Sequence, residues 1–231
     1  MQQIDENQKY AEKVALVLDA IGYQWGNVLK NLERMPFPDY VTSQKYCEIL
    51  YQYTSRHIAV TAEEQGSIPD PMKPFSRAFV EVLEAFCQLS MRTNLLSQEG
   101  AEALALIRDL ERCTLKANEG IEGAGGNVCE LVDLDRGLNE LTEAAQAKAD
   151  ILAALQRERV ELMEKASEKA QLLNGELLTL FSVGVLAPAG GEGNIKKLCK
   201  ALKSQERRKP GKPGFRVKPV GVKLRLPSWK K

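Results

Sequence analysis

The chain has 231 residues, of which 44% are hydrophobic, enough to build a core in one large domain or in a smaller domain with extensions. Its 32 Lys and Arg nearly balance its 31 Asp and Glu, and its five cysteines include no C-x-x-C pair. That cysteine usage fits neither a disulfide framework nor a zinc site and favours a reducing cytoplasmic compartment. The polar N-terminus has no signal-peptide pattern, and the apolar run at 177–189 is too short to span a bilayer.

The near-neutral total conceals a strong charge asymmetry. Residues 195–231 hold fourteen Lys or Arg and only one acid, Glu206, which gives a net charge of +13. The other 194 residues carry eighteen bases and thirty acids, which gives −12. Such a separation of charge is evidence about binding partners more than about the fold.

The first 119 residues read as a helical body of about four helices, because Leu, Ala, Glu, Gln and Lys dominate and strand-like alternation is lacking. A helix is predicted over 5–34, where apolar residues recur every three or four positions: Tyr10, Val14, Val17, Ile21, Trp25, Val28 and Leu32. Further helices are predicted over 40–65, from 74 or 75 to 96, and from Ser97 to about 118. The apolar face of the last comprises Leu104, Ile107, Leu110 and Leu115.

A glycine-rich hinge is predicted at 120–126, followed by a long amphipathic helix over 127–183. If unbroken, that helix would be about 80 Å long, so part of it is expected to pair as a coiled coil or to project as an arm. The alternative is a break at Gly137 or near Asn174–Gly175 that folds the segment into a hairpin. The overall prediction is an all-α protein, with a Gly/Pro/Ala linker at 184–194 and an irregular basic tail at 195–231.

Few features suggest chemistry, and no catalytic, cofactor-binding or metal-binding residue is predicted. The glycines at 120–126 lack the G-K-[ST] and preceding strand of a phosphate loop, so a hinge is the better interpretation. His57 is the only histidine, which rules out a metal site built on several histidines within this chain. Cys199 lies among lysines that would lower the pKa of its thiol, but oxidation sensitivity is a better expectation than catalysis.

The tail is the strongest functional signal. Cations interleaved with proline, glycine and two aromatic residues suit an arm that follows a phosphate backbone, because charges release counterions and rings stack on unpaired bases. The predicted polyanion-binding residues are Lys196, Lys197, Lys200, Lys203, Arg207, Arg208, Lys209, Lys212, Phe215, Arg216, Lys218, Lys223, Arg225, Trp229, Lys230 and Lys231. Alternatively, the tail lies on an acidic protein surface, including the body itself, or is a passive extension.

These observations favour a non-enzymatic assembly or adaptor protein that forms a homo-oligomer through its helices and binds nucleic acid or an anionic assembly through its tail. The residues expected to mediate self-association are Leu138, Leu141, Leu152, Leu155, Met163 and Leu173. The alternative is a helical chaperone or export adaptor that holds an amphipathic helix of a client protein. An enzyme whose active site is scattered over several helices is the least favoured reading.

Overall fold

The structure, a computed structural model, describes residues 2–34, 37–122 and 128–186. Its described part is 93% helical and contains no strands, which confirms the predicted all-α class. The α-helices are α1 (Gln2–Leu32), α2 (Tyr40–Glu63), α3 (Lys73–Glu122) and α4 (Val128–Ser182). Two short 3-10 helices, η1 (Glu64–Gly66) and η2 (Asp70–Met72), connect α2 to α3.

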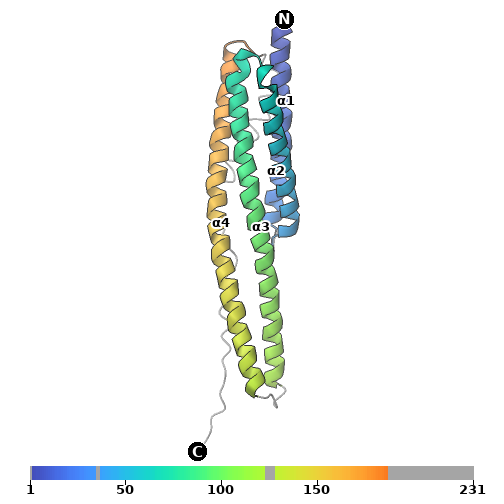
Figure 1. Cartoon of the computed structure of the whole chain (residues 1–231), viewed down its shortest axis with the longest axis vertical. Helices are drawn as coiled ribbons and strands as arrows, with labels where there is room; N and C mark the ends of the chain where they lie inside the picture. Colours follow the sequence, from blue (N-terminus) through green and yellow to red (C-terminus); the bar gives the residue numbers. More distant parts are fainter. Residues whose placement is uncertain (1, 35–36, 123–127, 187–231) are drawn as a thin grey trace, which may run out of the picture.

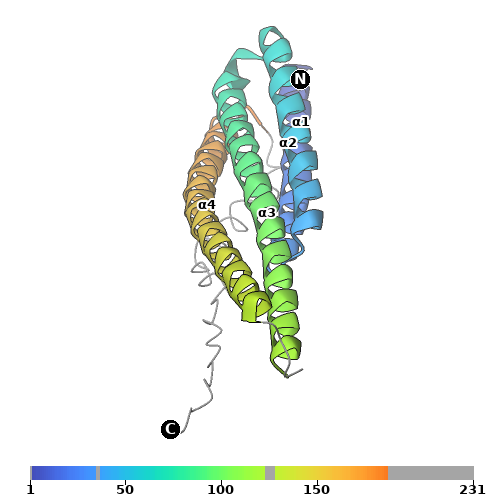
Figure 2. The ribbon, with the colours of Figure 1, turned by 60° about the horizontal axis from the view of Figure 1, so that its bottom comes forward.

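The four helices run alternately up and down along one axis (Figures 1 and 2). α3 packs between α2 and α4, and α1 packs on α2. The ribbon shows that α1 and α2 lie alongside only the upper part of α3 and α4, whereas the lower parts of α3 and α4 continue together (Figure 1). The body is therefore a four-helix bundle at one end and a two-helix hairpin at the other.

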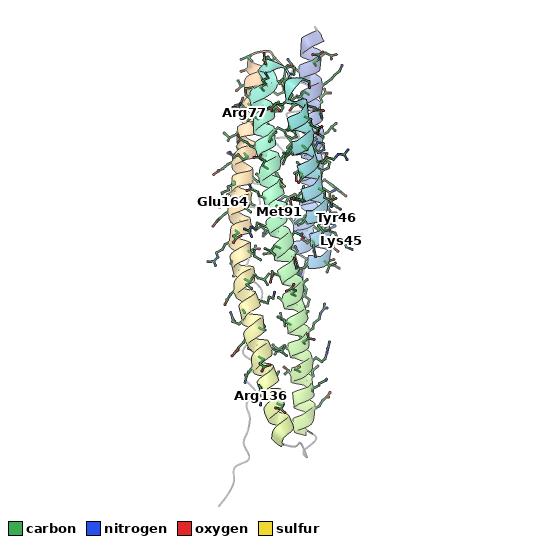
Figure 3. The ribbon with its side chains drawn as sticks, viewed as in Figure 1. Lys45, Tyr46, Arg77, Met91, Arg136 and Glu164 are labelled. Carbon is green, nitrogen blue, oxygen red and sulfur yellow. The ribbon has the colours of Figure 1, made fainter. Side chains whose placement is uncertain are left out.

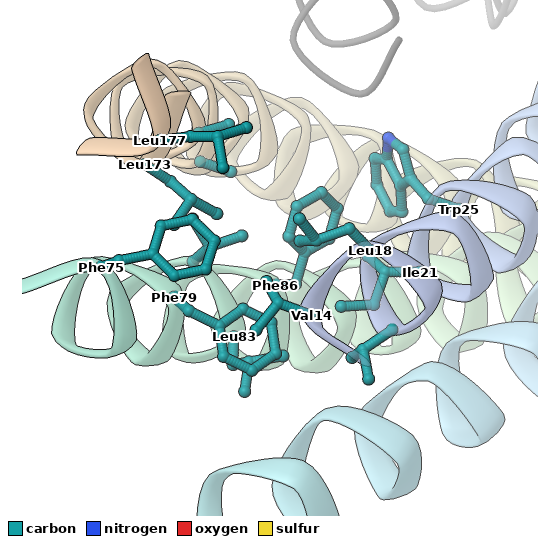
Figure 4. Packing of buried hydrophobic residues seen from close by; sticks show 14 of the residues in the cluster. Val14, Leu18, Ile21, Trp25, Phe75, Phe79, Leu83, Phe86, Leu173 and Leu177 are labelled. Atoms are coloured by element: carbon teal, nitrogen blue, oxygen red, sulfur yellow. The ribbon is translucent and has the colours of Figure 1, made fainter. Parts of the chain in front are cut away.

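The main core lies in the four-helix part, where α1, α3 and α4 converge with α2 (Figure 4). Aromatic side chains of α3 form its centre, and the rings of Trp25 and Phe86 meet edge to face with centroids 6.3 Å apart. Nearer the end of the bundle, Tyr10 and Phe75 meet in the same way at 6.4 Å. The face predicted for the first helix is buried here, since Val14, Ile21 and other residues of that face belong to this core.

A capping residue defines the start of α2. Asp39 accepts a hydrogen bond from the backbone amide of Thr42 at 3.0 Å, which satisfies one of the free amides of the first turn. Its own backbone amide donates to the carbonyl oxygen of Asn31 at 2.9 Å. The connection between α1 and α2 is thereby tied to both helices.

α3 is longer than predicted, because the expected break between Leu96 and Ser97 is absent. The buried Ser97 hydroxyl bonds the carbonyl oxygen of Thr93 at 2.9 Å and the hydroxyl of Ser43 on α2 at 3.1 Å. These polar contacts are made without interrupting the helix. Described residues up to 119 thus contain three long α-helices in place of the expected four.

α4 is one continuous helix of 55 residues, about 80 Å long at 1.5 Å per residue. Neither Gly137 nor Asn174–Gly175 breaks it, so the hairpin alternative within this segment is wrong. It ends at Ser182, and the φ of 74° at Gly184 lets the amides of Val185 and Leu186 bond back to the carbonyl oxygen of Leu180. Residues 123–127 of the predicted hinge, most of the linker (187–194) and the whole basic tail lie outside the described residues.

Candidate functional site

The lower parts of α3 and α4 extend beyond the end of the α1–α2 layer. Tyr40, the first residue of α2, packs its ring against Gly100 of α3. Leu32, the last residue of α1, packs against a small cluster of buried residues, which comprises Leu96, Ala103, Leu152 and Leu155. Past this level, no other described helix lies beside α3 and α4 (Figure 1). We call residues 104–122 and 128–151 the arm (Figure 1).

The apolar face that α1 and α2 cover in the bundle continues along the arm, where no other described helix covers it. On α3, Leu104 and Ile107 lie seven residues beyond Ser97 and Gly100, both of which contact α2. On α4, Leu138 and Leu141 lie fourteen residues before Leu152 and Leu155, whose cluster packs on Leu32. Steps of seven and fourteen residues preserve a helical face, so we call Leu104, Ile107, Leu115, Leu138 and Leu141 the open face.

Burial shows that the arm lacks a complete core. Ala145 is the single buried side chain among those that the structure describes in the arm, whereas the leucines and isoleucine of the open face are half-buried or exposed. Leu115 is 63% exposed, although leucine at a helix–helix interface is usually buried. Two helices side by side bury only part of such a stripe, and a further layer of helix would be needed to cover it.

Ion pairs join α3 to α4 at the root of the arm and in the bundle. Lys148 bridges Glu99 and Glu102 at 2.5 Å each, at the root of the arm. The hydrogen bond to Glu102, followed by that to Glu99, raises the pKa of Lys148. Arg92 and Glu158 make a similar pair in the bundle at 3.2 Å. These partly exposed pairs fit the antiparallel alignment of the two helices, and each adds little to its stability because solvent screens the charges.

The side-chain view shows how far the arm extends beyond the bundle (Figure 3). Arg136 lies low on α4, well below the level of Lys45 and Tyr46 in the lower part of α2. Arg136 is 67% exposed and pairs with Asp133, one turn earlier in the same helix, which is 73% exposed. Both charges therefore face solvent.

The residues predicted for self-association fall into two groups. Leu152, Leu155, Met163 and Leu173 are buried inside the chain's own helices, so their apolar side chains are already used within one molecule. Leu138 and Leu141 lie on the open face of the arm and remain partly accessible. Self-association itself stays a prediction, and Leu138 and Leu141 are the members of the set available for it.

A polar layer at the lower end of the bundle was missed by sequence reasoning. Arg159 of α4 is largely buried, and desolvation lowers its pKa, opposed by the charge of Glu33 at the end of α1. The neighbouring Cys47 thiol is fully buried, which raises its pKa to about 12. The signal in the sequence was a cation within an apolar stripe, between Leu155 and Met163. Arg159 thus lies near the lower end of the α1–α2 layer, one turn from Leu155.

The remaining candidates do not form a site in the described part of the chain. His57 is half-buried beside Tyr53, and burial, followed by the charges of Lys13 and Arg56, lowers its pKa. No group of three or more possible metal ligands occurs among the described side chains. Cys199 and all sixteen predicted polyanion-binding residues lie outside the described residues.

Comparison with protein-family models, with curated proteins and with solved structures finds no match. Within the described ranges, no helix combines the length and apolar character needed to cross a membrane. The functional argument therefore depends on the arm and on the charge of the tail.

Proposed function

We propose that this chain is a non-enzymatic assembly protein. Its body self-associates through the arm, and its basic tail, residues 195–231, binds nucleic acid or another polyanion. The observation that carries the first part is the open face, an apolar stripe that follows the small cluster of Leu96, Ala103, Leu152 and Leu155 along α3 and α4 but lacks a second layer of described helices. The +13 charge of the tail supports the second part.

Association by the arm is favoured by the physics of helix pairs. Apolar stripes on helices gain stability when a further layer removes them from water, by about 25 cal/mol for each Å² of apolar surface buried. In the bundle, α1 and α2 supply that layer and bury residues such as Phe86 and Leu89 completely. The arm carries the same pattern of leucines without the layer, so an external helix pair would complete it.

The structure places Leu186, the last described residue, far from the tip of the arm. At the far end of α4, Leu186 is buried, and Asn7 of α1 donates a hydrogen bond to the carbonyl oxygen of Val185 at 3.5 Å. The chain therefore continues past Leu186 from the end of the bundle, about 80 Å from the tip of the arm. Pairing through the arm would leave the tail accessible to a polyanion.

The tail is tested by binding to short duplex and single-stranded nucleic acids over a salt series. The comparison is between the full chain and a full-length variant in which the fourteen tail cations are replaced by glutamine. If the tail makes 6 to 10 phosphate contacts, affinity falls about 10³- to 10⁵-fold between 50 and 200 mM salt. A matched control replaces Lys9, Lys13, Lys30 and Lys45 of the body by glutamine and should keep its affinity. Equal binding by the wild type and the tail variant would contradict the proposal.

A second candidate function uses the same open face. As a chaperone or export adaptor, the chain would cover the open face with an amphipathic helix of a client protein, a common mode of helix recognition. The half-buried leucines of the arm favour this reading as well. It predicts a monomeric chain that binds its client stoichiometrically even when the tail cations are neutralised.

A further inference from the structure

The layered arrangement of the helices restricts how two arms can meet. In the bundle, α1 and α2 form a layer over one face of the α3–α4 pair, with the core between the layers (Figure 4). In the arm the same face of α3 and α4 is open. Each arm is itself a pair of antiparallel helices with an apolar face, the same kind of element that α1 and α2 provide.

We propose that the open faces of two copies pack on each other with the two molecules antiparallel. Each arm then takes the position on the other copy that α1 and α2 take on the bundle. This inference rests on the proposed self-association. It adds that the partner is a second copy of the chain, that the two copies are antiparallel, and that the pair can bridge two polyanions. In such a two-fold pair, α3 lies against the partner's α3 and α4 against the partner's α4, and all neighbouring helices run in opposite directions, as in the bundle.

A parallel pair is excluded by the α1–α2 layer. If two copies faced each other in the same direction, both α1–α2 layers would stand between the two α3–α4 pairs. Packed helix layers are about 8 to 10 Å apart, so the arms would be held about 25 to 30 Å apart and could not touch. In the antiparallel arrangement each arm reaches past the end of the other copy's layer.

The length of the arm fits this arrangement. Residues 104–122 of α3 extend about 28 Å past the end of the layer, at 1.5 Å per residue. The tip of one arm would then reach the α1–α2 connection of the other copy. Phe37 is 63% exposed there and Val41 is 57% exposed, so the tip meets apolar side chains that the single chain leaves uncovered. The open face and its end contact are thus continuous with the core of the bundle.

The charge of the arm defines how this contact responds to salt. The arm sequence holds ten acids and five bases, a net charge of −5 on each copy. Two such arms repel each other, so the attraction has to come from the apolar face, and added salt screens the repulsion. Arm pairing is therefore expected to persist or strengthen with salt. An association that depended on attraction between the basic tail and the acidic body would instead weaken as salt is added.

Antiparallel pairing places the last described residue of each copy, Leu186, at opposite ends of the assembly. Two molecules of about 80 Å that overlap along about 28 Å form a rod about 135 Å long. Each copy contributes one basic tail to the pair, so the pair carries two polyanion-binding segments. The pair is thus a bivalent cross-linker that bridges two separate stretches of nucleic acid.

The experiment places a photo-cross-linking amino acid at Glu119, an exposed residue near the tip of α3, in the full-length chain. Equal amounts of ¹⁵N-labelled and unlabelled protein are mixed, and cross-linked peptides are identified by mass spectrometry. Antiparallel pairing predicts peptides that join residue 119 of one copy to residues 33–41 of another. In the same molecule residue 119 lies about 28 Å beyond Gly100, too far to reach this segment. Cross-links from tip to tip, or a dimer without cross-links to residues 33–41, would overturn the inference.

A double variant, Leu138→Glu with Leu141→Glu, separates this inference from the proposed function. It should be monomeric, keep the wild-type affinity for a single duplex, and lose the ability to capture a second duplex carrying a different label. Leu172→Glu is the matched control, because Leu172 is 57% exposed on the bundle part of α4 and should leave bridging unchanged. Circular dichroism checks that both variants keep their helices. If the wild-type chain is monomeric, the proposed self-association is refuted. If the double variant still forms a dimer and bridges two duplexes as well as the wild type does, only the role of the open face is refuted.

Discussion

Replacing Gly100 by alanine sets two opposing effects against each other at one position of α3. In a helix interior, alanine is favoured over glycine by about 1 kcal/mol. At Gly100, however, the new Cβ would lie 2.5 Å from Cε1 and Cζ of the Tyr40 ring and 2.7 Å from Cδ1. The ring must move, and Tyr40 is the first residue of α2, so the end of that helix is pushed away from α3. Overpacking of this kind costs about 1 to 3 kcal/mol.

The expected net effect is a loss of up to about 2 kcal/mol in the free energy of unfolding. Gly175→Ala is the matched control, because nothing lies within 4 Å of its added Cβ, and it should stabilise the protein by about 0.5 to 1 kcal/mol. Urea denaturation followed by circular dichroism measures both values. In a double-mutant cycle, Tyr40→Ala should remove most of the cost of the alanine at position 100. The reasoning fails if Gly100→Ala stabilises as much as Gly175→Ala, or if the two positions show no coupling.

Three further predictions address the core, the cap of α2 and the buried thiol. Leu173→Ala should cost about 2 to 5 kcal/mol because Leu173 is fully buried, whereas Leu172→Ala, at an exposed position, should change stability by less than about 0.5 kcal/mol; similar losses would contradict the placement of the core. Asp39→Ala should cost about 1 kcal/mol at pH 7. The hydrogen bond from the backbone amide of Thr42 holds the pKa of the Asp39 carboxyl below its usual value. The ionised carboxylate therefore stabilises the folded protein fully above the unfolded-state pKa, and this contribution is lost as pH falls through the folded-state pKa. The difference in melting temperature between wild type and Asp39→Ala should therefore narrow in acid, and a constant difference would count against the cap. Burial raises the pKa of Cys47 to about 12, so a thiol reagent at pH 8 should modify the half-buried Cys113 before Cys47, which should react only on unfolding, as measured by mass spectrometry of the labelled peptides.

Helical periodicity predicted the elements better than their connections. The spacing of apolar residues placed the helix over 5–34 and the long helix over 127–183 close to their observed bounds, because both helices are amphipathic along their whole length. The predicted break between Leu96 and Ser97 failed for a physical reason. Serine and glycine often end helices, but here Ser97 and Gly100 are small residues that let α2 approach α3.

The candidate site could be predicted only in part. Periodicity identified Leu138 and Leu141 as apolar positions of the long helix, but it also selected Leu152 and Met163 with equal weight. A helical stripe shows which face is buried and gives no information about which neighbour buries it. The distinction between the covered and the open part of that stripe depends on where α1 ends and α2 begins. That boundary is a property of the tertiary fold.

The most direct test of the account is the molar mass of the full-length chain by sedimentation equilibrium in 150 and 500 mM NaCl. The account predicts a dimer that is at least as stable at 500 mM, and a monomer for Leu138→Glu with Leu141→Glu, because the association is apolar and the arms carry like charge. A wild-type chain that is monomeric at both salt concentrations, or a dimer that dissociates as salt is raised, would contradict it.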